Sequence, residues 1–321
     1  TGEPGPELFP QDMMNRVLNK CSNKIKSLGY LEAKGLLELR EILSQYLKTY
    51  GIDVSPSSIL IVSGALQALQ LISMSLLPPG SKILMENPSY LKSIHIFQSL
   101  GMNLVGLKMD NEGIMSNEIL KNVGKKVNTL LYTIPTFHNP TGIVMTEDRR
   151  MKILDICQSC RIPIIEDDVY RELWIDEVPP MPLKTKDKNG NVLYLGSISK
   201  SLAPGFRIGW VAGPEYVIER LSDIKMQTDY GSSSISQLIL TEWISSGFYT
   251  EHLEKLRIQL KYRRDTAIEI LNKNFKDIAV WDVPKGGFYI WLKLKCNISM
   301  NKLFLEAIKE KILINLGNIY D

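Results

Sequence analysis

The stretch VLYLGSISKSLAPGFRIGWVA, residues 192–212, is the most informative part of this chain. It begins and ends with apolar runs, at 192–196 and 208–212, that have the length and composition of buried strands. Lys200 lies between them among serines, and Arg207 follows seven residues later. A lysine directly after a buried strand can be desolvated, which lowers the pKa of its amine and makes it a nucleophile. For an isolated S-x-x-K pattern the alternative is an ordinary lysine in a surface turn.

Further β-rich runs precede this stretch and alternate with helical patterns. We expect strands at 59–62, 82–85, 103–107, 129–132 and 162–166, and helices at 65–77, 89–99 and 146–159. Strands that alternate with helices are typical of an α/β fold with a mostly parallel sheet. Together with the two runs around Lys200, the sequence predicts a seven-stranded sheet covered on both faces.

The regions on either side of the sheet indicate a smaller companion unit. Residues 233–274 have a helical pattern, IAVWDVPKGGFYIWLKL (278–294) predicts two strands around Gly286-Gly287, and a helix follows near 301–311. Near the N-terminus we expect one helix that ends at Gly29 and another closed by Gly51. The predicted domains are an N-terminal segment at 1–35, a large domain at 36–262 and a small α+β domain at 263–321.

Composition limits the class of protein. With 321 residues, 44% hydrophobic and 23% charged, the chain can bury a large core. A net charge of +3 gives no indication of nucleic acid or of an anionic membrane, and polar residues interrupt the apolar stretch 59–77. Four cysteines and no secretory signal predict a cytoplasmic protein. Cys157 and Cys160 lack the further ligands of a zinc site, so we expect helix-packing thiols and no metal.

A possible anion site follows the first predicted strand. In Ser63-Gly-Ala-Leu-Gln67 the free backbone N–H groups of Gly64, Ala65 and Leu66 open a helix, and the helix dipole favours a phosphate there. Arg207 and Ser197 would add charge-assisted and hydroxyl hydrogen bonds to the same phosphate. A glycine between a strand and a helix can also be only a turn.

The signature S-x-S-K-x-x-x-P-G-x-R-x-G-W at 197–210 resembles the cofactor-lysine motif of fold-type I aminotransferases, enzymes that depend on pyridoxal 5'-phosphate (PLP). Other motifs of that family follow in its order, such as N-P-T-G at 139–142. The resemblance implies the aspartate-aminotransferase fold, with a large PLP-binding domain and a smaller α+β domain. It also implies that Lys200 forms a Schiff base with PLP and that Ser197, Ser199 and Arg207 contact the cofactor.

The same resemblance assigns roles to residues after the other strands. Tyr90 would stack on the pyridine ring, with a packing tyrosine as the alternative. Asn139 and Tyr170 would bind the phenolic oxygen, and Asp167, with Asp168 as its neighbour, would pair with the pyridinium nitrogen. Tyr30 resembles the tyrosine that reaches across the dimer interface to the neighbouring phosphate, so the resemblance implies a homodimer.

The opening GEPGPELFP and the run at 29–47 resemble one branch of the family in particular. That branch contains aminoadipate- and kynurenine-type aminotransferases and the MocR-like regulators, in which an aminotransferase-like domain follows a GntR-type winged helix. We expect an aminotransferase that moves an amino group between an amino acid and a 2-oxo acid. The alternative is the PLP-binding effector domain of a MocR-like (GntR family) regulator, with nucleic acid as a partner only if a winged helix precedes the chain.

Both ends of the chain lead us to expect a piece of a longer protein, because there is no leading methionine and no closing helix. The family arginine that grips the substrate carboxylate is expected after residue 321.

Overall fold

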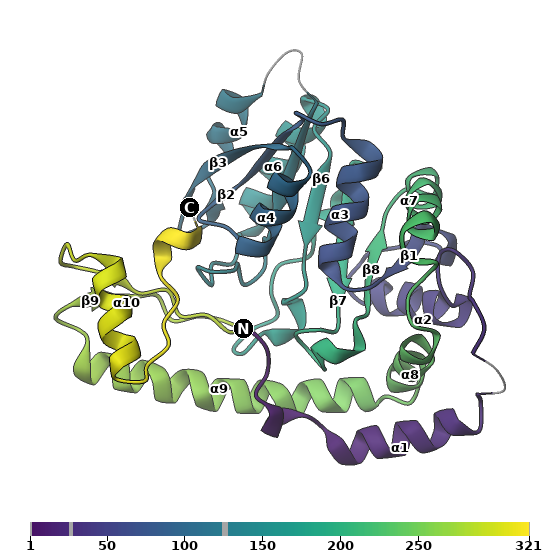
Figure 1. Cartoon of the computed structure of the whole chain (residues 1–321). Coiled ribbons are helices and arrows are strands. Elements are labelled where there is room, and N and C mark those ends of the chain that lie inside the picture. The colour runs from purple at the N-terminus through teal and green to yellow at the C-terminus, as the bar shows by residue number, and fades with distance from the viewer. Residues whose placement is uncertain (1, 26–27, 124–127, 321) are drawn as a thin grey trace.

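The computed structural model describes residues 2–25, 28–123 and 128–320 (Figure 1). Its centre is an eight-stranded sheet in the order β1-β8-β7-β6-β5-β2-β3-β4. The strands are β1 (Ile59–Val62), β2 (Lys82–Asn87), β3 (Asn103–Asp110), β4 (Gly113–Ile114), β5 (Thr129–Thr133), β6 (Ile164–Asp167), β7 (Val192–Ser197) and β8 (Gly209–Ala212). All seven predicted strands are present. The eighth, β4, was missed because a two-residue strand leaves no apolar run to recognise.

Strand direction places the site at one edge of the sheet. β3, β2, β5, β6 and β7 are parallel neighbours, whereas β8 runs antiparallel to both β7 and β1. The loop between β7 and β8 is shorter than the dozen or more residues that a parallel crossover needs, which explains the reversal of β8. The carboxyl ends of the parallel strands and the beginning of β8 therefore share one edge.

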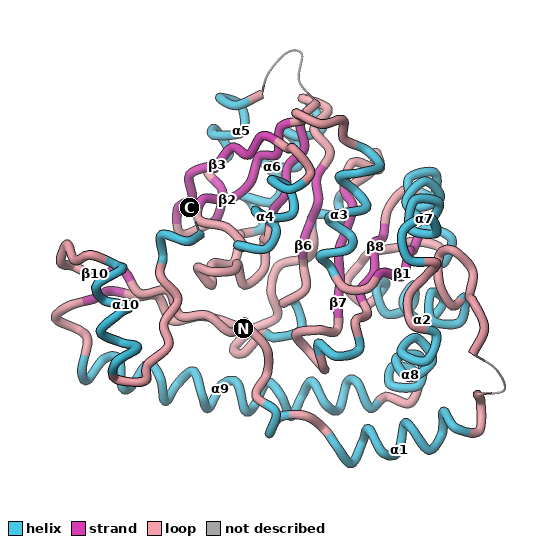
Figure 2. Tube along the Cα trace, in the orientation of Figure 1, coloured by secondary structure: helices cyan, strands magenta, loops and turns pink. Residues whose placement is uncertain are grey.

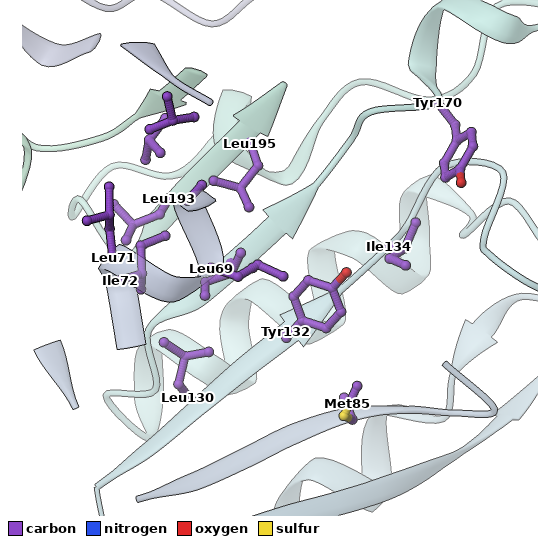
Figure 3. Close-up of a cluster of buried hydrophobic side chains, with 14 of the residues drawn as sticks. Leu69, Leu71, Ile72, Met85, Leu130, Tyr132, Ile134, Tyr170, Leu193 and Leu195 are labelled. Carbon is purple, nitrogen blue, oxygen red and sulfur yellow. The ribbon is translucent and has the colours of Figure 1, made fainter. Parts of the chain in front are cut away.

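Helices cover both faces of this sheet. α3 (Ala65–Leu76), α4 (Leu91–Ser99) and α7 (Glu215–Asp229) pack on one face, and α2 (Leu37–Lys48), α5 (Ser116–Asn122), α6 (Glu147–Ser159) and α8 (Ser234–Ser245) pack on the other. Figure 3 shows Leu69 of α3 among apolar side chains of β5 and β7. On α6, Cys157 is fully buried in this packing, as expected for a thiol that serves the core. Short 3-10 helices occupy Pro6–Leu8, Pro56–Ser58, Arg171–Leu173, Leu183–Lys186, Pro204–Phe206 and Gly317–Tyr320.

The first helix is shorter than predicted. α1 (Gln11–Ser22) ends at Ser22, with Asn23 as its C-cap and well before Gly29, and residues 26–27 lie outside the described part of the chain. Its buried side chains are Met13, Met14, Val17 and Cys21, so the helix stops soon after its last buried contact. The prediction was wrong because Gly29 was taken as the helix end, although Ser22 and Asn23, which favour helix ends and turns, come earlier.

A 27-residue helix, α9 (Phe248–Asn274), leads from the sheet region to the C-terminal part (Figures 1 and 2). There, β9 (Ala279–Val280) pairs with β10 (Lys293–Leu294), and α10 (Met300–Lys309) follows. The expected boundary at 262/263 falls inside α9, so the domain division stays a prediction. Among the described residues, no helix is both long and apolar enough to cross a membrane.

Candidate active site

A pocket lies at the edge of the sheet where the parallel strands end. Most of the residues proposed from the sequence line it, and Asn139 and Tyr30 are the exceptions. The lining consists of Gly64, Ala65, Leu66, Tyr90, Ile134, Asp167, Val169, Tyr170, Ser197, Ser199, Lys200 and Arg207. Segments after β1, β2, β5, β6 and β7 thus meet in one place, as the parallel sheet requires.

Lys200 points its amine into this pocket from the loop after β7. Its Nζ donates a 2.6 Å hydrogen bond to the carbonyl oxygen of Gly2, so the N-terminal segment lies directly against the amine. Burial lowers the pKa of Lys200, although the charges of Asp167 and Glu3 act in the opposite direction. The loop is pinned by Ser197, whose hydroxyl donates to the Ile208 carbonyl at 2.9 Å. The amine therefore has the lowered basicity of a nucleophile.

The acidic pair after β6 is divided between two environments. Asp167 is 3% exposed, and its Oδ2 accepts a 2.8 Å hydrogen bond from the Tyr132 hydroxyl. Its Oδ1 is buried and has no hydrogen-bond partner in the described structure. Asp168 also has a buried Oδ1 without a partner in the described structure, but its Oδ2 is paired with Arg171 and it does not line the pocket. The carboxylate at 167, and not the one at 168, is therefore available to the pocket.

Burial is also the main cause of the high pKa of Asp167. Desolvation raises that pKa to about 6, although the hydrogen bond from Tyr132 lowers it. The neighbouring buried carboxyl of Glu86, which binds the Ile134 amide through Oε1, has a pKa of about 7 for the same principal reason. Ionised carboxylates are thus costly at the strand ends beside the pocket.

Asn139 lies behind the pocket and links two tyrosines. Its Nδ2 donates to the hydroxyl oxygen of Tyr170 at 3.1 Å and to that of Tyr289 at 3.2 Å. The two hydroxyl oxygens are 3.4 Å apart. Asn139 is 2% exposed, and its Oδ1 lacks a partner among the residues described. The amide and the two phenols form one polar cluster, which brings together Asn139 and Tyr170, the two residues expected to bind the same cofactor oxygen.

The turn after β1 has the form of a phosphate cradle. Gly64 has a φ of +88°, and an added Cβ would come within 2.9 Å of Arg207 Nη2, so a larger residue would be strained and crowded. Arg207 donates to the Ser63 carbonyl at 2.7 Å, which holds its guanidinium over the turn. The amide of Ser63 donates to Gln67 Oε1 at 2.7 Å. A cation and the first amides of α3 therefore face the same side of the pocket.

The two remaining predicted tyrosines differ in position. Tyr90 lines the pocket, and burial raises its pKa to about 12. Tyr30 is 86% exposed and packs against Tyr230, with ring centroids 5.5 Å apart, away from the pocket of its own chain. Its expected contact needs a second chain and stays a prediction.

Sequence reasoning missed three contributors to the site: Gly2, Tyr132 and Tyr289. Tyr132 was assigned to a strand, and an alternation rule gives no sign that its hydroxyl reaches Asp167. Tyr289 was also assigned to a strand, but it lies between β9 and β10 and follows Gly287, whose φ is +74°. The paired glycines before it were the available signal for a tight approach to another segment.

The chemistry of the pocket is that of an amine, a buried acid and a cationic cradle. These groups could hold a phosphorylated ring with a protonated nitrogen, because the cradle suits a phosphate and Asp167 Oδ1 is left to accept a proton donor. No group of three or more His, Cys, Asp or Glu side chains in the described ranges is arranged to hold a metal ion.

Comparison with known proteins places the chain in a family. The family model for aminotransferase class I and II matches residues 13–320. The HTH-type transcriptional regulator YdfD of Bacillus subtilis is 58% identical over 319 residues, which cover 99% of this chain and 66% of YdfD. The HTH-type transcriptional regulator NorG of Staphylococcus aureus is 38% identical over 99% of this chain and 72% of its own length.

A solved structure has the same fold. The kynurenine aminotransferase of Pyrococcus horikoshii, whose structure was solved in complex with PMP, matches with a TM-score of 0.94 and 34% identity. The match covers 100% of this chain and 81% of that one. This chain has the fold of the PLP-dependent aminotransferases and belongs to the aminotransferase class I and II family.

Proposed function

We propose that this chain binds PLP covalently through Lys200. The observation that carries the proposal is that the amine of Lys200, the unpartnered Oδ1 of Asp167 and the cradle at Gly64 meet in one pocket. Family membership supports the same cofactor, as does the PMP in the Pyrococcus structure.

Each residue of the pocket would contact a different part of the bound cofactor. PLP, when bound, supplies an electron-withdrawing ring that stabilises negative charge on the carbon that carries the amino group. Asp167 would keep the ring nitrogen protonated, while Asn139 and Tyr170 would bind the phenolic oxygen. The amides after β1 and Arg207 would neutralise the phosphate. Lys200, with its lowered pKa, can accept a proton at Nζ and return it.

The activity we propose for this pocket is aminotransfer between an amino acid and a 2-oxo acid. It is supported by the family and by the aminotransferases of known structure. We further propose a homodimer in which Tyr30 of each chain contributes to the site of the other, and a cytoplasmic location.

A second function is favoured by the curated relatives. YdfD and NorG are named as transcriptional regulators, and this chain spans 66% of the length of YdfD. We propose that the longer protein is a regulator in which this domain senses an amino acid through PLP. This is the role that we favour for the longer protein, because the identity to YdfD is 58% whereas that to the Pyrococcus enzyme is 34%. The Gly2 contact gives the N-terminal segment direct access to the Lys200 amine.

Both proposed functions require the covalent binding of PLP to Lys200. Borohydride reduction of the purified protein with PLP, followed by peptide mapping, tests this binding. We expect a phosphopyridoxyl group on Lys200. Lys225 is an internal control, because it is 1% exposed and its amine is paired with Asp229 outside the pocket. A label on Lys225, or none on Lys200, would contradict both functions.

The full-length protein separates the two functions. Candidate amino acids are added with PLP and 2-oxoglutarate, and both glutamate formation and binding to the promoter of its own gene are measured. Glutamate formed over many turnovers supports the aminotransferase. A change in DNA binding without sustained turnover supports the regulator.

A further inference from the structure

Two tyrosine–aspartate pairs are built in the same way on opposite faces of the sheet. Tyr132 of β5 is paired in register with Ile165 of β6, so Asp167, two residues further along β6, projects from the face of Tyr132. Tyr194 of β7 is paired with Glu166, so Asp168 projects from the other face. Each tyrosine hydroxyl donates to Oδ2 of its aspartate, at 2.8 Å and 3.2 Å respectively. The chain therefore contains a natural matched pair.

Only one of these aspartates belongs to the pocket. Both aspartates have a buried Oδ1 without a partner in the described chain, but only Asp167 lines the pocket, and Asp168 forms an ion pair with Arg171. Because Tyr132 occupies Oδ2, the oxygen left for a ligand is Oδ1. An unrestrained carboxylate could rotate and exchange its two oxygens.

The tyrosine that occupies Oδ2 is itself rigidly held. Tyr132 is fully buried, and its ring packs edge-on against Phe97 with centroids 5.5 Å apart (Figure 3 shows its hydroxyl on the side of Ile134, away from Leu130). A phenol fixed in this way has little freedom to follow a moving carboxylate, so the geometry of the acid is set by β5.

We propose that Tyr132 is a positioning residue that fixes the Asp167 carboxylate and presents Oδ1 to the protonated ring nitrogen of a bound cofactor. The proposal rests on the function proposed above for the ring. It assigns to β5 a role in the site in addition to its role in the core.

The electrostatics support this arrangement. Burial raises the pKa of Asp167 to about 6, and the Tyr132 hydrogen bond is the largest influence that lowers it. The ionisable groups that interact with Asp167 besides Tyr132 are Glu86, Tyr90, Asp168, Tyr170 and Lys200. Loss of the phenol should therefore raise the pKa further and reduce the ionised fraction near neutral pH.

The test compares Tyr132→Phe with Tyr194→Phe, which removes the same atom from the other pair. The pKa of Asp167 is measured in cofactor-free protein by NMR of ¹³C-labelled aspartate, with Asp167→Asn used to assign the signal. We expect Tyr132→Phe to raise this pKa by about one unit, a tenfold change in the proton dissociation constant, and to weaken PLP binding at pH 7.5 by about 3–10-fold. Tyr194→Phe should change the proton dissociation constant of Asp167 and the dissociation constant of PLP by less than about twofold.

A second substitution keeps the test decisive if Tyr132→Phe does not fold. Site-specific 3-fluorotyrosine at position 132 is a stronger hydrogen-bond donor and should lower the pKa of Asp167. An unchanged Asp167 pKa in both variants, or an equal effect of Tyr194→Phe, would overturn the role of Tyr132. Failure of the unmodified protein to bind PLP would instead overturn the proposed function, because the Asp167 titration needs no cofactor.

Discussion

The two sides of the pocket are built differently. On one side, Gly64, Asp167 and Lys200 follow strands of a single sheet, so their spacing is fixed by the register of that sheet. On the other side, Gly2 and Tyr289 come from segments near opposite ends of the chain and meet the site through a few hydrogen bonds. The strand-end side provides a rigid template, and the closing side adds weaker contacts to it. Substitutions on the first side should therefore have larger effects.

The largest effect is expected for Lys200→Ala. This substitution removes the proposed covalent link, so PLP should be lost completely on extensive dialysis, as followed by absorbance. Lys255→Ala, on the exposed surface of α9, is the control and should retain the cofactor. If the Lys200→Ala protein still held PLP covalently, Lys200 would not be the residue that links the cofactor to the protein.

Asp167→Asn should change stability in a manner that depends on pH. The folded pKa of about 6 lies above the ordinary 3.8, so proton uptake stabilises the fold fully below about pH 3.8, and this stabilisation is lost as the pH rises through about 6. Asparagine avoids the buried charge. At pH 8 the free energy of unfolding of cofactor-free protein should rise by up to about 3 kcal/mol, with little change at pH 4. Urea unfolding of both proteins at pH 8 and at pH 4 measures this change in the free energy of unfolding.

The control for that experiment is Asp168→Asn, which breaks the buried pair with Arg171 and should destabilise the protein. If Asp167→Asn also destabilised the protein at pH 8, the ionised carboxylate of Asp167 would stabilise the fold, which would contradict the predicted cost of its burial.

Arg207→Ala tests the cradle of the strand-end side. A charge-assisted hydrogen bond to phosphate contributes about 1.5–3 kcal/mol, so the dissociation constant of PLP should rise by about 10–100-fold. Arg220→Ala is a matched control, because Arg220 also donates to a backbone carbonyl, that of Ser75 near the far end of α3. Fluorescence titration with PLP measures both variants, and similar affinities would argue against a phosphate at Gly64.

The smallest effect is expected on the closing side, for Tyr289→Phe. Loss of one hydroxyl leaves Asn139 with one acceptor fewer and should lower the free energy of unfolding by about 1 kcal/mol. Tyr262→Phe, at a ring that is 70% exposed, should have no measurable effect. A change in the free energy of unfolding for Tyr289→Phe as large as the change of about 3 kcal/mol expected for Asp167→Asn would make the two sides equal and contradict the comparison.

The strand-end side is also the part that the sequence predicts well. Lys200, Asp167 and Gly64 each follow an apolar run, and their convergence needs only the rule that parallel strands end at a common edge. Tyr289 and Gly2 could not be placed, because no local pattern states which distant segment they meet. Tyr132 shows a different limit. The apolar pattern predicts that its ring is buried, but it does not predict which group its hydroxyl binds. The length of α1 was overestimated because Gly29 was taken as the end of the helix, and a glycine signal does not register where buried contacts stop.

The reversed direction of β8 has a further consequence for how such a site evolves. Since β8 returns at once beside β7, Lys200 and Arg207 are carried by one tight loop, and no crossover helix separates them. A deletion or insertion between the two residues would displace the amine relative to the guanidinium, so the length of this loop cannot change without disturbing both groups. We therefore expect the Lys200 amine and the Arg207 guanidinium to be retained together, so a lineage that lost catalytic turnover could still bind the ligand.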